Sequence, residues 1–155
     1  MKTTLSSIAL AIFLLSQALV SQSAADPWSA ADLLEPAVLA KTLQSSNAKP
    51  PVVLAVAFSV LYNNKHLPHA IFAGPGSTPA GIDALKQAVA NLPKDSDIVI
   101  YCGCCPMEKC PNIRPAYSML KQMGFTTVRV LRVPTNMATD WFDKGYPSEN
   151  GSALK

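Results

Sequence analysis

The four cysteines of this 155-residue chain lie within nine consecutive positions, at Cys102, Cys104, Cys105 and Cys110. A thiolate is both a strong nucleophile and a soft metal ligand, so such a cluster can support nucleophilic, thiol–disulfide or metal chemistry. Disulfides that stabilise a fold usually close long loops, and the rest of this chain has no cysteine with which to close one. The cluster therefore indicates a reactive site rather than a structural crosslink.

Cys102 directly follows the apolar run "IVIY", which predicts a buried parallel strand. The cysteine-containing loop then leads into "RPAYSMLKQMGF", where the apolar residues recur with helical spacing and Gly124 favours the end of a helix. Unpaired N–H groups at the start of this helix, together with the guanidinium of Arg114, favour an anion and lower the pKa of a nearby thiol. This segment predicts a cradle for a nucleophilic thiolate and an anionic substrate.

The rest of the chain alternates helical and strand-like segments. The first predicted elements are a helix over 36–45, a strand at "VVLAVAF", and a turn-rich connection over 61–81 with a short strand at 69–73. A helix at "IDALKQAVANL" follows, and strands at "DIVIY" and "TTVRVL" lie before and after the helix that follows the cysteines. The last predicted element is a helix at "TNMATDWFDKG", capped by Thr135 or Asn136. Such alternation predicts an α/β fold with a three-layer, doubly wound parallel sheet of about five strands. Ligands bind at the carboxyl ends of the strands in such sheets, where Cys102 is expected.

The N-terminus has the pattern of a secretory signal. Lys2 is followed by the apolar run "IALAIFLLSQALV" and the small residues "SQSAA", which predicts cleavage after Ala25. Residues 1–25 are then a signal peptide and 26–155 a single domain, exported to a periplasm or secreted. The apolar run is shorter than the roughly 20 residues that span a bilayer, so no stable membrane insertion is expected after processing. The net charge is +3 and the basic residues are scattered, which argues against nucleic-acid binding.

An ordered set of segments over about 28–150 resembles the rhodanese family of single-domain sulfurtransferases. "VVLAV" corresponds to the family strand that ends in Asp-Val-Arg, "KHLPHAIF" to "GHIPGAI", "IVIYC" to the strand that ends in the active cysteine, and "DWFDKGYP" to the closing Trp and Gly-Tyr-Pro. The resemblance implies that Cys102 accepts sulfane sulfur from a small anionic donor such as thiosulfate, forms a persulfide, and passes the sulfur to a thiol acceptor. It assigns Arg114 the role of closing the loop, and it implies no cofactor and no resident metal.

The cysteine loop differs from the family pattern. Eleven residues separate Cys102 from Arg114, where the family usually has four. Because the additional residues contain Cys104, Cys105 and Cys110, these are expected to be accessory or resolving thiols. Cys110 is a second candidate nucleophile because it lies closer in sequence to Arg114, although the position of Cys102 at the end of a strand favours Cys102.

Two positions near the expected site also differ from the family pattern. Ala55 and Ala57 stand where the second-strand motif of the family has Asp and Arg. Asn112, two residues after Cys110, is a candidate cap for the helix that follows the loop.

Other readings of the cluster remain open at this point. The four thiols can form local disulfides, and nearby thiols exchange readily, which fits a thiol–disulfide redox protein. Soft thiolates also suit Cu(I) or zinc, with His66 and His69 as additional ligands. A non-catalytic binding module on the same fold is a further alternative.

Overall fold

The computed structural model describes residues 25–151, so nearly all of the predicted signal peptide lies outside the described residues. The elements, in chain order, are β1 (Leu33–Leu34), α1 (Pro36–Gln44), β2 (Val52–Ala55), α2 (Ser59–Asn64), β3 (Lys65–His66), β4 (Ile71–Phe72), α3 (Pro79–Ala88), β5 (Ile98–Tyr101), α4 (Ile113–Gln122), β6 (Val128–Leu131) and β7 (Glu149–Asn150), with 3-10 turns at Ala30–Asp32 and Met107–Lys109 and a π-helical turn at Ala138–Phe142. No helix within this part of the chain is long and apolar enough to cross a membrane.

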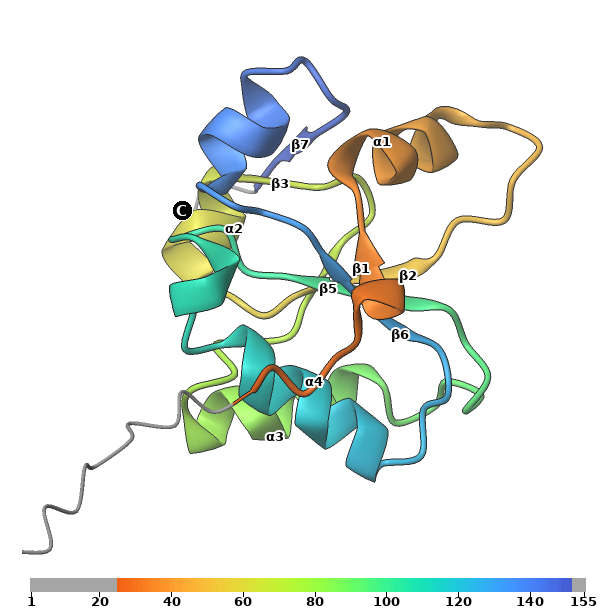
Figure 1. Ribbon diagram of the computed structural model, residues 1–155, viewed down its shortest axis with the longest axis vertical. Helices are drawn as coiled ribbons and strands as arrows, with labels where there is room; N and C mark the ends of the chain where they lie inside the picture. The colour runs from red at the N-terminus through yellow and green to blue at the C-terminus, as the bar shows by residue number, and fades with distance from the viewer. Residues whose placement is uncertain (1–24, 152–155) are drawn as a thin grey trace, which may run out of the picture.

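A five-stranded sheet forms the centre of the molecule. Its strand order is β1-β6-β5-β2-β4, and every neighbouring pair is parallel. All four residues of β5 are buried, as expected for a strand that is paired on both sides and covered on both faces. This arrangement confirms the predicted parallel sheet of about five strands. The carboxyl ends of β2 and β5 point toward the side of the molecule that carries α2 and the cysteine loop (Figure 1).

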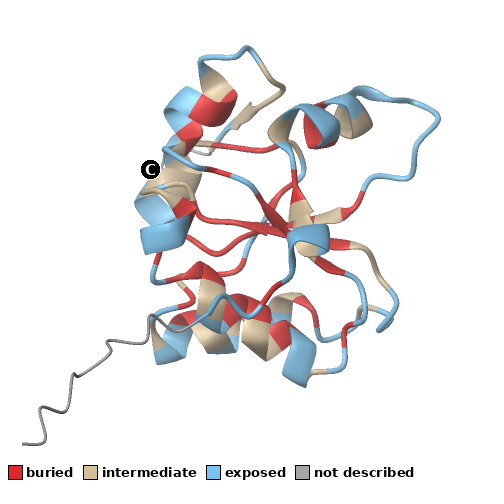
Figure 2. Cartoon of the chain, in the orientation of Figure 1, coloured by how far each residue is buried: buried red, intermediate tan, exposed pale blue. Residues whose placement is uncertain are grey.

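Helical segments cover both faces of the sheet. The helices α3 and α4 pack on one face, while α1 and the π-helical turn lie on the other (Figure 1). Each face has its own apolar core, and the buried residues gather along the central strands (Figure 2). Because side chains alternate along a strand, Tyr101 joins the core on the α1 face and Cys102 joins the core shared with α3 and α4. The side chain of Cys102 therefore packs on the face of the sheet that α3 and α4 cover.

Three elements differ from the sequence prediction. The edge strand β1 at Leu33–Leu34, which pairs with β6, was not predicted, whereas the first helix begins at Pro36 as expected. The predicted connection after the second strand contains the helix α2, whose first turn is closed by hydrogen bonds from the N–H groups of Leu61 and Tyr62 to the Phe58 carbonyl. The small antiparallel pair of β3 with β7 was not predicted, because two-residue strands are too short to show an alternating pattern.

Candidate active site

Cys102 is the first residue after β5, and only 4% of it is exposed. Its sulfur accepts a hydrogen bond from the Asn112 side-chain amide, with Nδ2 at 3.2 Å from Sγ. The side-chain oxygen of Asn112, Oδ1, accepts a hydrogen bond from the Ser77 backbone N–H at 3.1 Å. The side chain of Asn112 therefore does not cap α4 as predicted. It connects the loop before α3 to the reactive sulfur.

The inserted residues fold back so that three sulfurs converge. Cys104 Sγ lies 3.5 Å from Cys102 Sγ, and the sulfurs of Cys102, Cys104 and Cys110 all lie within 4.8 Å of one another. Cys105 Sγ contacts Cys104 Sγ at 3.2 Å but is not a member of this group. All four cysteines are free thiols in this structure. We call Cys102, Cys104 and Cys110 the three-thiol cluster.

Contacts to the rest of the fold hold the loop in this path. The Met107 N–H donates to the Val133 carbonyl at 2.9 Å, which attaches the middle of the loop to the segment after β6. The Cys110 N–H then donates to the Met107 carbonyl at 3.2 Å. Met107 and Cys110 are both buried in the core on the α4 face. Burial of these two side chains therefore places Cys110 next to Cys102.

The surroundings of Cys102 favour its thiolate. A hydrogen bond from the Cys110 thiol is the largest influence, and together with donors on Asn112 and Cys104 it outweighs the burial of the sulfur and lowers the pKa of Cys102 to about 6. The pKa of Cys110 is raised, chiefly because its thiol donates to the Cys102 thiolate. Partial desolvation and the neighbouring sulfurs raise the pKa of Cys104 to about 12. Of these three thiols, Cys102 is the one that ionises at neutral pH.

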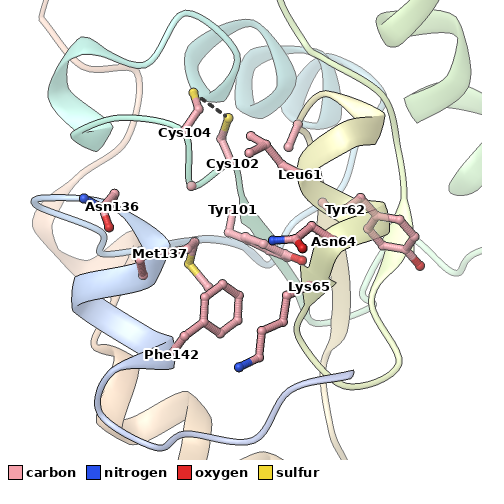
Figure 3. A pocket seen from close by; sticks show the side chains of 14 residues that line it. Leu61, Tyr62, Asn64, Lys65, Tyr101, Cys102, Cys104, Asn136, Met137 and Phe142 are labelled. Atoms are coloured by element: carbon pink, nitrogen blue, oxygen red, sulfur yellow. Dashed lines mark hydrogen bonds between the residues drawn. The ribbon is translucent and has the colours of Figure 1, made fainter. Parts of the chain in front are cut away.

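A cavity of about 390 Å³ lies next to Cys102. Figure 3 shows Cys102 and Cys104 on one side of it and Met137, Phe142 and Lys65 on the opposite side. Among the described residues that line this cavity, Lys65 is the only charged one, and its Nζ lies 4.8 Å from the centre of the Phe142 ring. The site thus combines a thiolate, mostly apolar walls and one cation.

The two alanines in the second-strand segment also line this cavity. Ala55 and Ala57 are nearly fully buried and contribute only methyl groups to its wall. Since the rhodanese pattern has Asp and Arg at these positions, the substitution leaves space and removes two charges. Lys65 provides the cation from another direction, and it stands at the first glycine of the "GHIPGAI" pattern. The sequence prediction did not include Lys65 in the site. A charged side chain at a glycine position of the family pattern was the signal that could have identified it.

Arg114 has contacts that differ from the predicted ones. Its Nη2 lies 2.5 Å from Asp26 Oδ1, and its guanidinium lies 5.5 Å from the centre of the Trp28 ring. Arg114 is not among the residues that line the cavity. Ile113, its neighbour in the first turn of α4, is the residue that turns into the core. A contact between Arg114 and an anionic donor stays a prediction.

His66 lies in β3 and His69 in the turn that follows, and both contact Glu149 of β7 rather than the three-thiol cluster. His66 Nε2 lies 3.6 Å from Glu149 Oε2, and the His66 ring stacks on Tyr62 with 4.1 Å between ring centres. His69 Nδ1 lies 3.5 Å from Glu149 Oε1. The structure therefore does not bring the histidines to the thiols, as the metal-binding alternative with histidine ligands would require.

Comparisons with known proteins agree with this architecture. The profile of the family described as "Rhodanese-like domain" matches residues 35–133. A comparison with curated proteins finds no match. The rhodanese-like domain of an Anabaena sp. protein is similar with a TM-score of 0.59 and 21% identity, over 80% of this chain and 83% of that chain.

Two named sulfurtransferases also have similar structures. A thiosulfate sulfurtransferase from Pseudomonas aeruginosa gives a TM-score of 0.56 and 25% identity, over 79% of this chain and 20% of that chain. The 3-mercaptopyruvate sulfotransferase SseA from Escherichia coli gives a TM-score of 0.54 and 18% identity, over 79% of this chain and 52% of that chain. The family profile spans more than half of the chain and includes both β5 and the cysteine loop. The chain therefore belongs to the rhodanese-like domain family.

Proposed function

We propose that this protein is a sulfurtransferase in which Cys102 carries sulfane sulfur as a persulfide from a thiosulfate-like donor to a thiol acceptor. The observation that supports this most directly is a thiol of lowered pKa at the carboxyl end of β5, on a residue that lines a cavity with one cationic side chain. The similarity to the thiosulfate sulfurtransferase from Pseudomonas aeruginosa supports thiosulfate as the model donor. The family resemblance supports the same chemistry.

The proposed first step transfers one sulfur atom. The Cys102 thiolate attacks the outer sulfur of thiosulfate, the S–S bond of the donor breaks, and sulfite leaves with its electron pair. The product is a persulfide anion on Cys102. In the second step an acceptor thiolate attacks the outer sulfur of the persulfide, which restores the Cys102 thiolate and yields the acceptor persulfide. Charge and electrons balance in both steps, and no external oxidant is needed.

The residues around the sulfur support this cycle. The Cys110 thiol and the Asn112 amide donate hydrogen bonds that keep Cys102 ionised before the attack and each time the thiolate is restored. Lys65 supplies a positive charge to the cavity and attracts an anionic donor. The volume and the mostly apolar lining favour an organic thiol over a very small acceptor such as cyanide.

Sulfur uptake by the reduced protein tests the proposal. After incubation with thiosulfate and removal of excess donor, intact-mass spectrometry of the wild-type protein should show the gain of one sulfur atom. Cys102→Ser should show none, because a hydroxyl is neither ionised nor a soft nucleophile near neutral pH. Cys105→Ser is the matched control and should take up sulfur normally, since Cys105 lies outside the three-thiol cluster.

Two outcomes would change the assignment. Uptake that persists in Cys102→Ser and disappears in Cys110→Ser would move the nucleophile to Cys110. Uptake that needs both residues would make Cys110 a resolving thiol that acts together with Cys102. The absence of any uptake by the fully reduced wild-type protein would overturn the proposed function.

We also propose that the protein is exported after removal of residues 1–25. The support is the sequence pattern of Lys2, the apolar run and the small residues before Asp26. The mass and N-terminal sequence of protein recovered from a host with a secretory pathway should begin at Asp26. Recovery of an exported form that retains Met1 would contradict this proposal.

A further inference from the structure

We infer that the three-thiol cluster is a binding site for a single Cu(I) ion, a function separate from sulfur transfer. The sulfurs of Cys102, Cys104 and Cys110 lie within 4.8 Å of one another, although Cys110 follows Cys102 by eight positions. An ion placed among three sulfurs at this spacing reaches all of them after small side-chain movements. The fold of the loop therefore gathers three soft ligands around one point.

The number and type of ligands favour Cu(I) over zinc. Thiolates select soft metal ions, and protein zinc sites of the structural type use four ligands in a tetrahedron. The cluster offers three sulfurs, and Cys105 lies outside it. His66 and His69, the histidines of the chain, contact Glu149 instead. A site of three sulfurs, to which the described part of the chain adds no fourth cysteine or histidine ligand, suits three-coordinate Cu(I).

An outer hydrogen bond orients one ligand of the cluster. The Asn112 amide donates to Cys102 Sγ at 3.2 Å, and Asn112 Oδ1 in turn accepts from the Ser77 N–H at 3.1 Å. Such outer donors orient metal ligands and offset part of their negative charge. When Cu(I) binds, each of the three sulfurs becomes a thiolate and any thiol proton is released to solvent.

Exposure of the three sulfurs differs in a way that allows a metal to enter. Cys102 and Cys110 are buried, whereas Cys104 is exposed. A soft ion can meet Cys104 first and then pass to the two buried sulfurs. Since Cys102 is also the proposed sulfur acceptor, bound Cu(I) and a persulfide cannot occupy the site together. The copper-bound protein is thus expected to be protected against alkylation at Cys102.

The test is an anaerobic titration of the fully reduced protein with Cu(I) in the presence of a chromophoric Cu(I) chelator. We expect one Cu(I) per chain to be held against the chelator, with an X-ray absorption spectrum that shows three sulfur ligands. Cys104→Ser and Cys110→Ser should each weaken Cu(I) binding at least tenfold. Cys105→Ser, the neighbouring control, should bind Cu(I) like the wild-type protein. Sulfur uptake from thiosulfate is measured separately on the copper-free wild-type protein, so a failure of the metal site and a failure of the proposed activity can be told apart.

Several results would overturn this inference. One is the failure of the reduced wild-type protein to retain Cu(I) against the chelator. Another is a Cu(I) affinity of Cys104→Ser that equals that of the wild-type protein. Because Cys104 is exposed, its substitution is not expected to unfold the chain, so a change in affinity reports on the metal site. Tighter binding of Zn(II) than of Cu(I), measured by the same competition, would contradict the choice of metal. If the wild-type protein binds Cu(I) as expected but takes up no sulfur from thiosulfate, the result counts against the proposed sulfurtransferase function and not against the copper site.

Discussion

The reactivity of Cys102 depends on the few atoms that face its sulfur. Burial alone would raise the pKa of a thiol, because the thiolate loses hydration. Here the hydrogen bonds from Cys110, Asn112 and Cys104 outweigh that cost and lower the pKa of Cys102. The thiol is therefore protonated well below pH 6 and ionised well above it. Single substitutions of the donors should change this balance without changing the fold.

The first prediction concerns the pH dependence of Cys102 alkylation. Because the pKa of Cys102 is about 6, its alkylation rate should rise with pH and reach half of its maximum near pH 6. An ordinary cysteine, with a pKa of about 8.5, reaches half of its maximum well above neutrality. The rate should be followed by mass spectrometry of the peptide that contains Cys102.

Two variants of Cys110 provide the control for this measurement. Cys110→Ala removes the main donor and should move the midpoint upward by about one to two pH units, since a hydrogen bond to a charged group contributes about 1.5–3 kcal/mol. Cys110→Ser keeps a donor and should stay closer to the wild-type midpoint. Equal midpoints for the two variants would show that hydrogen bonding from residue 110 does not set the pKa.

The second prediction assigns the cation of the site to Lys65. Lys65→Ala should lower kcat/KM for thiosulfate roughly tenfold, because the cavity loses a favourable interaction of about 1.4 kcal/mol with the anionic donor. Lys65→Arg keeps the charge and should retain most of the activity. Arg114→Ala is the comparison at the position expected from the family pattern. A larger loss in Arg114→Ala than in Lys65→Ala would return the anion-binding role to Arg114.

At the level of elements, the site depends on contact between the loop before α3 and the first turn of α4. A Cβ atom at Gly76 would collide with the backbone carbonyl oxygen of Asn112 and lie 3.1 Å from Ala116 Cβ. The next residue, Ser77, donates its N–H to the Asn112 side chain. Glycine at position 76 therefore allows the approach that holds Asn112 against Cys102.

The third prediction follows from this close contact. Gly76→Ala should lower the free energy of unfolding by about 1–3 kcal/mol, because the loop and α4 must move apart. It should also raise the pKa of Cys102, since Asn112 shifts away from the sulfur. Urea denaturation and the alkylation profile measure the two effects.

Gly124→Ala is the control that separates the effect of losing a glycine from the effect of displacing Asn112. Gly124 has φ +87° at the end of α4, and a Cβ there would meet nothing within 4 Å. Its substitution should cost about 1–2 kcal/mol through backbone strain alone and leave the alkylation midpoint of Cys102 unchanged. A shift of the midpoint in Gly124→Ala would mean that general destabilisation, rather than the position of Asn112, controls the thiol.

Across the whole molecule, the N-terminal segment is attached to the outside of α4 before it forms the edge strand β1. Trp28 is only 8% exposed, belongs to the core on the α4 face, and packs edge-on against Tyr117 with 5.7 Å between ring centres. Arg114 lies against the same tryptophan and pairs with Asp26. In this structure Arg114 therefore helps to attach the start of the described chain.

The fourth prediction compares these two residues in stability. Trp28→Ala should reduce the free energy of unfolding by about 3–5 kcal/mol, because it removes a large buried side chain. Arg114→Ala should cost about 1–2 kcal/mol, the range expected for a partly exposed ion pair with a cation–π contact. Urea denaturation of both variants gives the comparison. A loss in Arg114→Ala as large as that in Trp28→Ala would contradict the view that apolar burial dominates this attachment.

Local sequence patterns were sufficient to predict the central parallel strands and the position of Cys102. Apolar runs such as "VVLA" and "IVIY" are local patterns, and their separation by helical segments is sufficient to predict parallel strands. Cys102 follows the second of these runs directly, so its place at the carboxyl end of β5 needed no knowledge of distant contacts. The family resemblance also depended on residues that are near one another in sequence.

The remaining parts of the site depend on contacts between residues that are far apart in the sequence. Asn112 contacts Cys102 and Ser77, which lies 35 positions earlier, and no local pattern specifies such a pair. Lys65 reaches the cavity from β3, while Arg114 turns outward to Asp26. In each case the burial of neighbouring side chains determines where the side chain points. The return of Cys110 to Cys102 has the same cause, because Met107 and Cys110 gain burial in the core only when the inserted loop folds back against it.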